Sequence, residues 1–360
     1  MEILSCENVA FKYNESTDYA ISDCTFSVKK GEKIMLCGAS GSGKSTLLRL
    51  LKRELSPRGE LSGNITLMGK GRSELSDRES AEKIGFVMQN PDSHTVCDKV
   101  SAELAFGLES FGVKSGEIQS RVGEMAAFFG IEPLYDRDIS TLSGGQKQLV
   151  ALCSVMVTDP DILLLDEPTA QLDPVAAREL LGILDRLNKE MGVTIIIAEH
   201  DPEELFDSCD KILYLSKGKT EFFGMPALTA KYFVENALEG FLPETAKAFA
   251  RLYDDLPLNV RQGRAKLEKL GVTDIPKQAD NVADSAEPYA LQCKNLWQRY
   301  EKDSPDILKG CDLGIRKGEC YGLLGSNGGG KSTLLRVICG LCKPYMGTVS
   351  LFGKKQKAYK

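Results

Sequence analysis

Short apolar runs alternate with longer amphipathic stretches through residues 1–232 of this chain. Four of these runs, KIGFVMQ, DILLLDE, TIIIAEH and KILYLSKG, have the length of a β-strand, and patterns with helical spacing separate them. Near-continuous apolar strands that alternate with helices are typical of a parallel sheet covered on both faces. The pattern therefore predicts a complete α/β domain.

The pattern changes after residue 232. The stretch ENALEGFLPETAKAFARLYDDL has helical apolar spacing, and KQADNVADSAEP is typical of a solvated linker. From about Pro288 the first pattern starts again, but without the strands that should flank its glycine-rich loop. We therefore expect a complete domain at 1–232, a helical and polar linker region at 233–287, and a truncated N-terminal part of a second domain at 288–360.

A long repeat relates the two ends of the chain. An offset of 287 positions (331 − 44) relates three pairs of residues, Tyr13 and Tyr300, Gly31 and Gly318, and Lys44 and Lys331. Each copy continues through an apolar strand, KIMLCG or CYGLLG, into a loop and a predicted helix, KSTLLRL or KSTLLRV. A repeat of this length indicates duplicated domains rather than a solenoid.

Each copy contains a glycine-rich loop that fits G-x-x-x-x-G-K-[ST]. In such a loop the backbone N–H groups and the following helix bind phosphates, the lysine reaches the β and γ oxygens, and the serine can ligate Mg²⁺. The predicted ATP-binding residues are Gly38, Ala39, Ser40, Gly41, Ser42, Gly43, Lys44, Ser45 and Thr46 in the first copy, and Gly325, Ser326, Asn327, Gly328, Gly329, Gly330, Lys331, Ser332 and Thr333 in the second.

Two carboxylates end the apolar run ILLLDE. A buried strand of this kind delivers its last residues to the carboxyl end of the sheet. Asp166 would then hold Mg²⁺ through water, and Glu167 would polarise the attacking water. An ordinary strand end with solvated acids is the alternative for this motif when it is taken alone.

A signature sequence, LSGGQ, stands between the first loop and ILLLDE; its residues are Leu142, Ser143, Gly144, Gly145 and Gln146. The three motifs in this order resemble the ATP-binding subunits of ABC transporters, over essentially the whole chain. The resemblance implies a P-loop NTPase fold of ABC ATPase type, in which an antiparallel β subdomain and a helical signature subdomain join the parallel core. In that family each signature completes the ATP site of a second ATPase domain in trans.

The resemblance also implies roles for four further residues. Gln89 matches the Q-loop glutamine, which senses the γ-phosphate and would join Ser45 and Asp166 around Mg²⁺. His200 matches the switch histidine, Asp173 the D-loop aspartate, and Tyr13 the aromatic side chain that stacks on adenine. The implied catalytic residues are Lys44, Gln89, Glu167 and His200. Taken singly, Gln89 could be a surface loop residue and Tyr13 a core aromatic.

A subfamily can be named from longer stretches. QNPDSHTVCDKVSAELAFGLESFGV, DEPTAQLDP and LPLNVRQGR resemble energy-coupling factor ATPases, some of which contain two ATPase domains in one chain. That resemblance implies uptake of a vitamin or transition-metal ion at the cytoplasmic face of the cell membrane. It implies two kinds of membrane partner, a coupling protein and a substrate-binding component.

Composition and net charge argue against some classes of function and location. The net charge of −6 argues against a nucleic-acid partner, and no apolar run reaches the ~20 residues of a membrane-spanning helix. The sequence start has no signal-peptide pattern, so we expect a cytosolic chain with reduced cysteines. A soluble tandem ABC protein that acts on ribosomes or nucleic acid remains the alternative class, but it should have a long basic or charge-dense linker.

No second LSGGQ follows Ser332 in the sequence. The ATP site at Lys44 would therefore need a signature from a homodimer partner or from another ATPase subunit. The alternatives are that the chain is a fragment, or that it is a truncated subunit that binds nucleotide without cycling.

Overall fold

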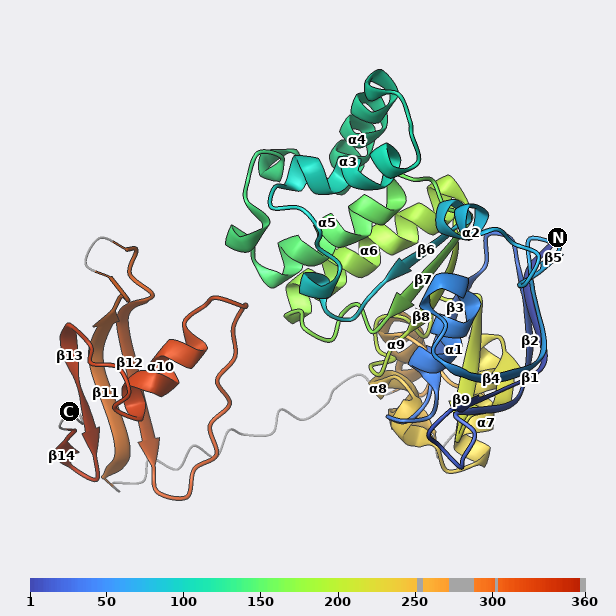
Figure 1. The fold of residues 1–360 in the computed structure, drawn as a ribbon. Helices are drawn as coiled ribbons and strands as arrows, with labels where there is room; N and C mark the ends of the chain where they lie inside the picture. The colour runs from blue at the N-terminus through green and yellow to red at the C-terminus, as the bar shows by residue number, and fades with distance from the viewer. Residues whose placement is uncertain (251–254, 272–287, 302–303, 357–360) are drawn as a thin grey trace. The chain divides into compact units, whose positions relative to one another are not determined.

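A computed structural model describes residues 1–250, 255–271, 288–301 and 304–356 (Figure 1). The chain divides into two compact units, Met1–Thr273 and Asp274–Lys360. The expected linker KQADNVADSAEP lies outside the described residues except for Pro288.

A six-stranded sheet forms the centre of the first unit, in the order β10-β9-β3-β8-β7-β6. All neighbouring strands are parallel except β10, which pairs with β9 in the antiparallel direction. The strands are β3 (Lys33–Cys37), β6 (Ile84–Val87), β7 (Ile162–Asp166), β8 (Thr194–Ala198), β9 (Lys211–Ser216) and β10 (Lys219–Gly224). The four strands predicted from apolar runs and the α/β fold class are confirmed.

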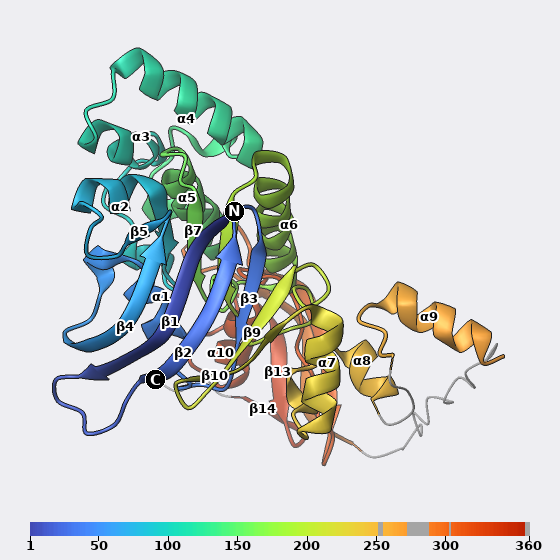
Figure 2. The same ribbon diagram turned by 90° about the vertical axis from the view of Figure 1, so that its right-hand side faces the viewer.

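An antiparallel sheet lies on one side of this core, in the order β2-β1-β4-β5 (Figure 2). Its strands are β1 (Glu2–Tyr13), β2 (Ile21–Lys29), β4 (Gly59–Leu67) and β5 (Lys70–Gly71). Helix α1 (Lys44–Leu51) packs its leucines in one hydrophobic cluster with residues of both sheets. The helix that follows the first glycine-rich loop is thus held between two sheets.

Alternate residues of a parallel strand face opposite sides of the sheet. In β7, Ile162 and Leu164 join the cluster on the antiparallel-sheet side, whereas Leu163 and Leu165 join the cluster on the opposite side. Successive side chains of a strand point to opposite faces, so both faces must be apolar when both are covered. This requirement explains the unbroken apolar runs in the sequence.

Helices cover the second face of the sheet and extend from it. Figure 1 shows α3, α4 and α5 gathered as a helical subdomain. The helices after α1 are α2 (Asp77–Lys83), α3 (Val100–Ser110), α4 (Ser115–Phe129), α5 (Gly144–Met156), α6 (Pro174–Met191), α7 (Pro226–Glu235), α8 (Glu244–Phe249) and α9 (Val260–Lys269). No helix among the described residues is long and apolar enough to cross a membrane.

The helical spacing from Glu235 to Leu256 does not produce one helix. Helix α7 ends at Glu235 and α8 begins only after Pro243, and both add side chains to the main core of the first unit. Proline has no N–H for an intrahelical hydrogen bond, so it stands at the start of α8 instead of inside a longer helix.

The second unit repeats the antiparallel part of the first. Its sheet has the order β12-β11-β13-β14 and packs with α10 (Lys331–Ile338) around a small core. The strands are β11 (Tyr289–Gln298), β12 (Leu308–Arg316), β13 (Met346–Leu351) and β14 (Lys354–Lys355). The pair Leu4↔Val28 has its counterpart in Leu291↔Ile315, so the offset of 287 positions is kept in the strand register.

The prediction of a strand at CYGLLG is wrong. Residues 319–326 form no strand, and Leu324 is 92% exposed, whereas its counterpart Cys37 in β3 is 3% exposed. Strand β3 pairs with β8 on one side and β9 on the other. No described residue of the second unit supplies either partner, and an isolated strand cannot satisfy its backbone hydrogen bonds.

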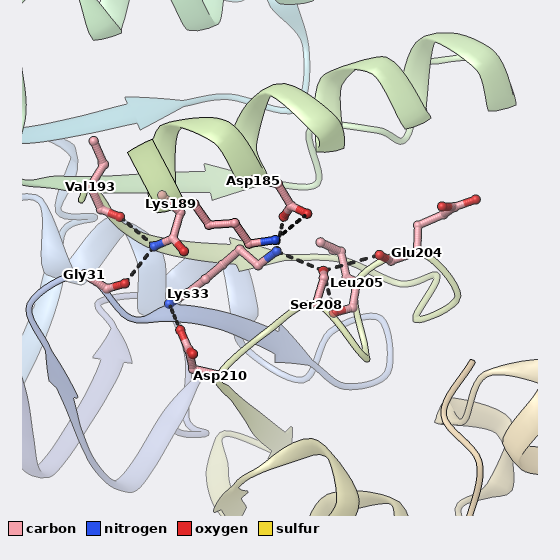
Figure 3. Close-up of polar contacts among 10 residues, drawn as sticks. Gly31, Lys33, Asp185, Lys189, Val193, Glu204, Leu205, Ser208 and Asp210 are labelled. Carbon is pink, nitrogen blue, oxygen red and sulfur yellow. Dashed lines mark hydrogen bonds and ion pairs between the residues drawn. The ribbon is translucent and has the colours of Figure 1, made fainter. Parts of the chain in front are cut away.

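A buried lysine joins β3, α6 and the segment before β9 in the first unit (Figure 3). Lys33 is 2% exposed, and its ammonium forms an ion pair with Asp185 of α6 and donates a hydrogen bond to Ser208. The backbone N–H of Lys33 donates to the Asp210 carboxylate at 2.7 Å. An unpaired charge at this depth is costly, so the contacts fix α6 and the segment before β9 against β3.

Replacing Lys33 by alanine is expected to destabilise the fold by about 3 kcal/mol, the lower end for breaking a buried ion pair, because Asp185 is partly exposed. Lys189→Ala is the matched control, since Lys189 pairs with the same carboxylate at 3.7 Å but is exposed. The control should change the free energy of unfolding by less than about 1 kcal/mol. Urea denaturation measures the free energy of unfolding of both variants. Equal losses would contradict the stabilising role of the buried pair between Lys33 and Asp185.

Candidate nucleotide-binding and hydrolysis site

The predicted site residues of the first unit meet along one edge of the parallel sheet. The order β3-β8-β7-β6 places the glycine-rich loop, His200, Asp166 and Gln89 at the carboxyl ends of neighbouring strands. In open α/β sheets ligands bind outside this edge. The topology thus brings together residues that are far apart in the sequence.

The first glycine-rich loop closes around its own lysine. The Lys44 ammonium donates to the carbonyl oxygens of Gly38 and Ala39 at 2.8 and 3.2 Å. Burial lowers the pKa of Lys44, and nearby Glu167 opposes this effect. Gly43 has φ +104°, and a Cβ there would lie 2.6 Å from the Ala20 carbonyl oxygen, so only glycine fits before α1.

A polar contact joins this loop to the end of β7. The Ser45 hydroxyl donates to the Asp166 carboxylate at 2.7 Å, and both line a cavity of about 370 Å³ together with Arg49 and Gln89. Burial raises the pKa of Asp166, while the hydrogen bond from Ser45 and the charge of Arg49 lower it. Oxygen donors from Ser45, Gln89 and Asp166 therefore line part of a cavity beside the phosphate loop, together with Arg49.

The Glu167 carboxylate is held between two residues from other strands. Gln89 Nε2 donates to Glu167 Oε2 at 2.9 Å, and His200 Nε2 lies 2.7 Å from Glu167 Oε1. The side chain of Glu167 is 16% exposed and that of His200 is 43% exposed, so the group faces solvent on one side. A carboxylate in this setting can accept a proton from a bound water.

Tyr13 stands at the end of β1, next to α1. Its hydroxyl forms a 2.9 Å hydrogen bond with Thr46, and its ring makes an edge contact with Phe11 at 5.0 Å between centroids. The equivalent pair in the second unit, Tyr300 and Thr333, has the same contact at 3.1 Å. The hydrogen bond fixes each tyrosine beside its own phosphate loop.

The LSGGQ residues begin helix α5 in the helical subdomain. Ser143 is the N-cap: Gln146 N–H donates to its hydroxyl at 3.3 Å, and the Gln146 side chain accepts from the Ser143 N–H at 3.0 Å. Leu142 is buried, whereas Gly144 and Gly145 lie in the first turn. A helix start of this kind presents N–H groups and a positive dipole end.

Asp173 has a similar capping position at α6. Its carboxylate accepts hydrogen bonds from the N–H groups of Val175 and Ala176, both at 3.0 Å. Four N–H groups at a helix start have no intrahelical partner, and this side chain satisfies two of them.

The second glycine-rich loop keeps the local geometry of the first. Lys331 donates to the carbonyl oxygens of Gly325 and Ser326 at 2.7 and 2.8 Å, as Lys44 does in its own loop. The chain before this loop is not a strand, and Tyr321 is 58% exposed. The loop is therefore preserved without the sheet that supports its counterpart.

Sequence reasoning missed three residues at the site. Arg49 follows Ser45 by one helical turn and faces the same cavity. Glu199 precedes His200 and accepts hydrogen bonds from Thr169. The position of Arg49 could have been found from helical spacing, whereas the contact between Glu199 and Thr169 depends on two separate strands.

Comparison with known proteins places this geometry in a family. A family model described as ABC transporter matches residues 21–170 and 308–360. A relative in Bacillus thuringiensis subsp. konkukian, provisionally named an ABC transporter ATP-binding protein, is 40% identical over 349 residues, 96% of this chain and 63% of that protein. A similarly named protein of Streptomyces coelicolor is 35% identical, over 95% of this chain and 66% of its own length.

Many solved structures resemble the fold, and two of them illustrate the similarity. One, described as cbiO1 from Clostridium perfringens and part of the ABC transporter complex cbiONQ, has a TM-score of 0.59 at 33% identity and covers 66% of this chain and 94% of that one. A dimeric ATP-binding cassette in a post-hydrolysis state with ADP and Pi has a TM-score of 0.55 at 27% identity, over 62% and 99%. The chain spans 63% of the length of the Bacillus relative. This chain belongs to the ATP-binding proteins of ABC transporters, a family of enzymes that hydrolyse ATP.

Proposed function

We propose that this chain binds and hydrolyses ATP to energise an ABC importer of the energy-coupling factor type, which takes up a vitamin or a transition-metal ion. The observation that supports hydrolysis best is the Glu167 carboxylate, held by Gln89 and His200 beside the phosphate loop. The importer role is supported by the similarity to cbiO1, which is described as part of a transporter complex.

The phosphate loop has the groups that ATP requires. The N–H groups of Gly38 to Ser45 and the start of α1 face the phosphates, and Lys44 exchanges its carbonyl contacts for the β and γ oxygens. Tyr13 stacks on adenine at the end of β1. Residues 325–333 bind a second nucleotide in the same way.

The residues around the cavity fit Mg²⁺. This ion favours hard oxygen ligands, keeps several waters, and is bound in such sites through one or two carboxylates and the substrate's phosphates. Ser45, Asp166 and Gln89 line the same space and supply a hydroxyl, a carboxylate and an amide oxygen. When bound there, Mg²⁺ neutralises charge on the β- and γ-phosphates.

Water is activated by Glu167. Its carboxylate takes the proton of a water aligned with the γ-phosphate, and His200 and Gln89 hold that carboxylate in place. Ser143 and the start of α5 add donors to the γ-phosphate of another ATPase domain, from a second copy or another subunit. Asp173, which caps α6, is the D-loop aspartate.

The domain arrangement follows from these roles. Residues 1–232 contain the motifs of a complete ATPase domain, 233–287 lead from it to the second copy with α8 packed on the core of the first unit, and 288–360 correspond to the N-terminal part of a second domain. Integral membrane subunits, a coupling protein and a substrate-binding component, bring the chain to the cytoplasmic face of the membrane. Nucleic acid is not a partner.

Purification of the chain from membranes tests this proposal. Co-purification with an integral membrane protein, together with ATPase activity of the complex, is the expected result. Salt-sensitive association with ribosomes and no membrane partner would instead favour a soluble tandem ABC protein. Nucleotide binding without turnover, even with the partner present, would exclude the hydrolytic role.

Asp166→Asn is expected to raise the Mg²⁺ concentration for half-maximal ATPase activity by about 10–100-fold, the usual cost of losing a residue that supports a metal site. Asp161→Asn is the matched control: it precedes the same strand and pairs with Lys30 and Lys83 instead. A Mg²⁺ titration of ATP turnover compares the two variants. Equal shifts would contradict the assignment of Asp166.

A further inference from the structure

A buried carboxylate lies beneath the turn that follows Glu167. Glu199 is 4% exposed, and its Oε1 accepts hydrogen bonds from Thr169 N–H at 3.0 Å and from the Thr169 hydroxyl at 2.7 Å. Glu199 directly precedes His200, and its own N–H donates to the Leu36 carbonyl of β3. One side chain therefore connects the turn after β7 with the segment after β8.

The turn that Glu199 holds has unusual backbone geometry. Glu167 has φ +49°, a left-handed conformation that side-chain-bearing residues seldom adopt. Two backbone hydrogen bonds support it, from Glu167 N–H to Ala198 O at 3.0 Å and from Ala170 N–H to Glu167 O at 3.2 Å. Such strain persists only where the surroundings over-determine the conformation, and it gathers at functional sites.

We propose that Glu199 is a positioning residue for hydrolysis: its carboxylate clamps Thr169 and so fixes the turn that holds Glu167 between Gln89 and His200. The proposal rests on the role of Glu167 proposed above. Glu199 acts through Thr169 and the adjacent backbone, and it contacts no reacting atom.

The burial of Glu199 supports a role beyond packing. An ionised carboxylate buried this deeply is unfavourable unless hydrogen bonds satisfy it. Burial raises the pKa of Glu199, and the two hydrogen bonds from Thr169 oppose that rise. An apolar side chain would fill the same space at lower cost, but it would release Thr169.

Two variants of Glu199, alanine and glutamine, distinguish its hydrogen bonds to Thr169 from its contribution to packing. Glu199→Ala is expected to lower kcat by about 10–100-fold, because misplacing a catalytic group by 1 Å costs this much, while KM for ATP changes little. Glu199→Gln keeps an acceptor oxygen for Thr169 and should recover kcat to within about threefold of the unchanged chain. Glu204→Gln, an exposed carboxylate in the same segment, is the matched control and should have no effect.

Thr169→Val tests the same contact at its donor residue. It removes the hydroxyl donor and keeps the N–H, so it should lower kcat by less than Glu199→Ala does. If both act through one contact, the double variant should be no slower than Glu199→Ala alone. Additive losses, an unchanged kcat in Glu199→Ala, or no recovery in Glu199→Gln would overturn the proposal.

Hydrogen exchange gives a readout that is independent of turnover. The Thr169 amide should exchange faster in Glu199→Ala than in the full unchanged chain, and in Glu204→Gln it should not. An unaltered exchange rate of the Thr169 amide in Glu199→Ala would overturn the proposal that Glu199 holds Thr169. ATP hydrolysis by the unchanged chain, measured in the same series, tests the proposed function separately.

Discussion

Glu167→Gln should keep ATP binding and lose turnover by a factor on the order of 10²–10⁴, the usual contribution of a general base. The amide has the shape of the carboxylate and retains an oxygen that accepts from Gln89, so the site geometry should persist. It cannot take a proton from water. ATP should then hold two ATPase domains together without being consumed.

Two measurements follow from this variant. Equilibrium binding should give an ATP affinity close to that of the unchanged chain, and size-exclusion chromatography with ATP and Mg²⁺ should show an ATP-dependent dimer. Glu190→Gln is the control, because Glu190 is exposed at the end of α6 and pairs with Arg186. Unchanged turnover in Glu167→Gln would mean that the base is assigned to the wrong residue.

Local patterns predicted most of the first unit. The strands β6, β7, β8 and β9 each coincide with an apolar run, because a strand covered on both faces needs apolar side chains at every position. The ILLLDE run likewise pointed to Asp166 and Glu167, and the family resemblance pointed to His200; all three stand at strand ends where the topology joins them. These signals lie within a few residues and need no tertiary information.

The features that were missed depend on partners from distant parts of the chain. Lys33 stands in a polar KGEK turn, yet α6 and the segment before β9 bury it. CYGLLG has the same apolar character as KIMLCG, but it forms no strand without neighbours. The clamp between Glu199 and Thr169 likewise joins two strand ends. Composition alone cannot tell a buried polar group from an exposed one.

Lys44→Ala and Ser143→Arg should each abolish ATP turnover and restore part of it when the two chains are mixed. Lys44→Ala removes the lysine of the phosphate loop, whereas Ser143→Arg removes the signature donor, which typically costs ~10²–10³ in rate. In a head-to-tail pair, one composite site receives both defects and the other receives none. With random pairing, half of the dimers are mixed, so about a quarter of the activity should return.

Ser143→Arg also removes the N-cap of α5, so a folding defect must be separated from loss of the signature. Ser76→Arg is a matched control, because Ser76 caps α2 with the same kind of capping box, formed with Glu79. Each lost cap costs about 1 kcal/mol, which thermal melting can compare. Recovery in the mixture requires both chains to be folded. If Ser143→Arg melts like Ser76→Arg, Lys44→Ala is folded, and no mixture regains activity at any concentration, the homodimer of this chain is excluded.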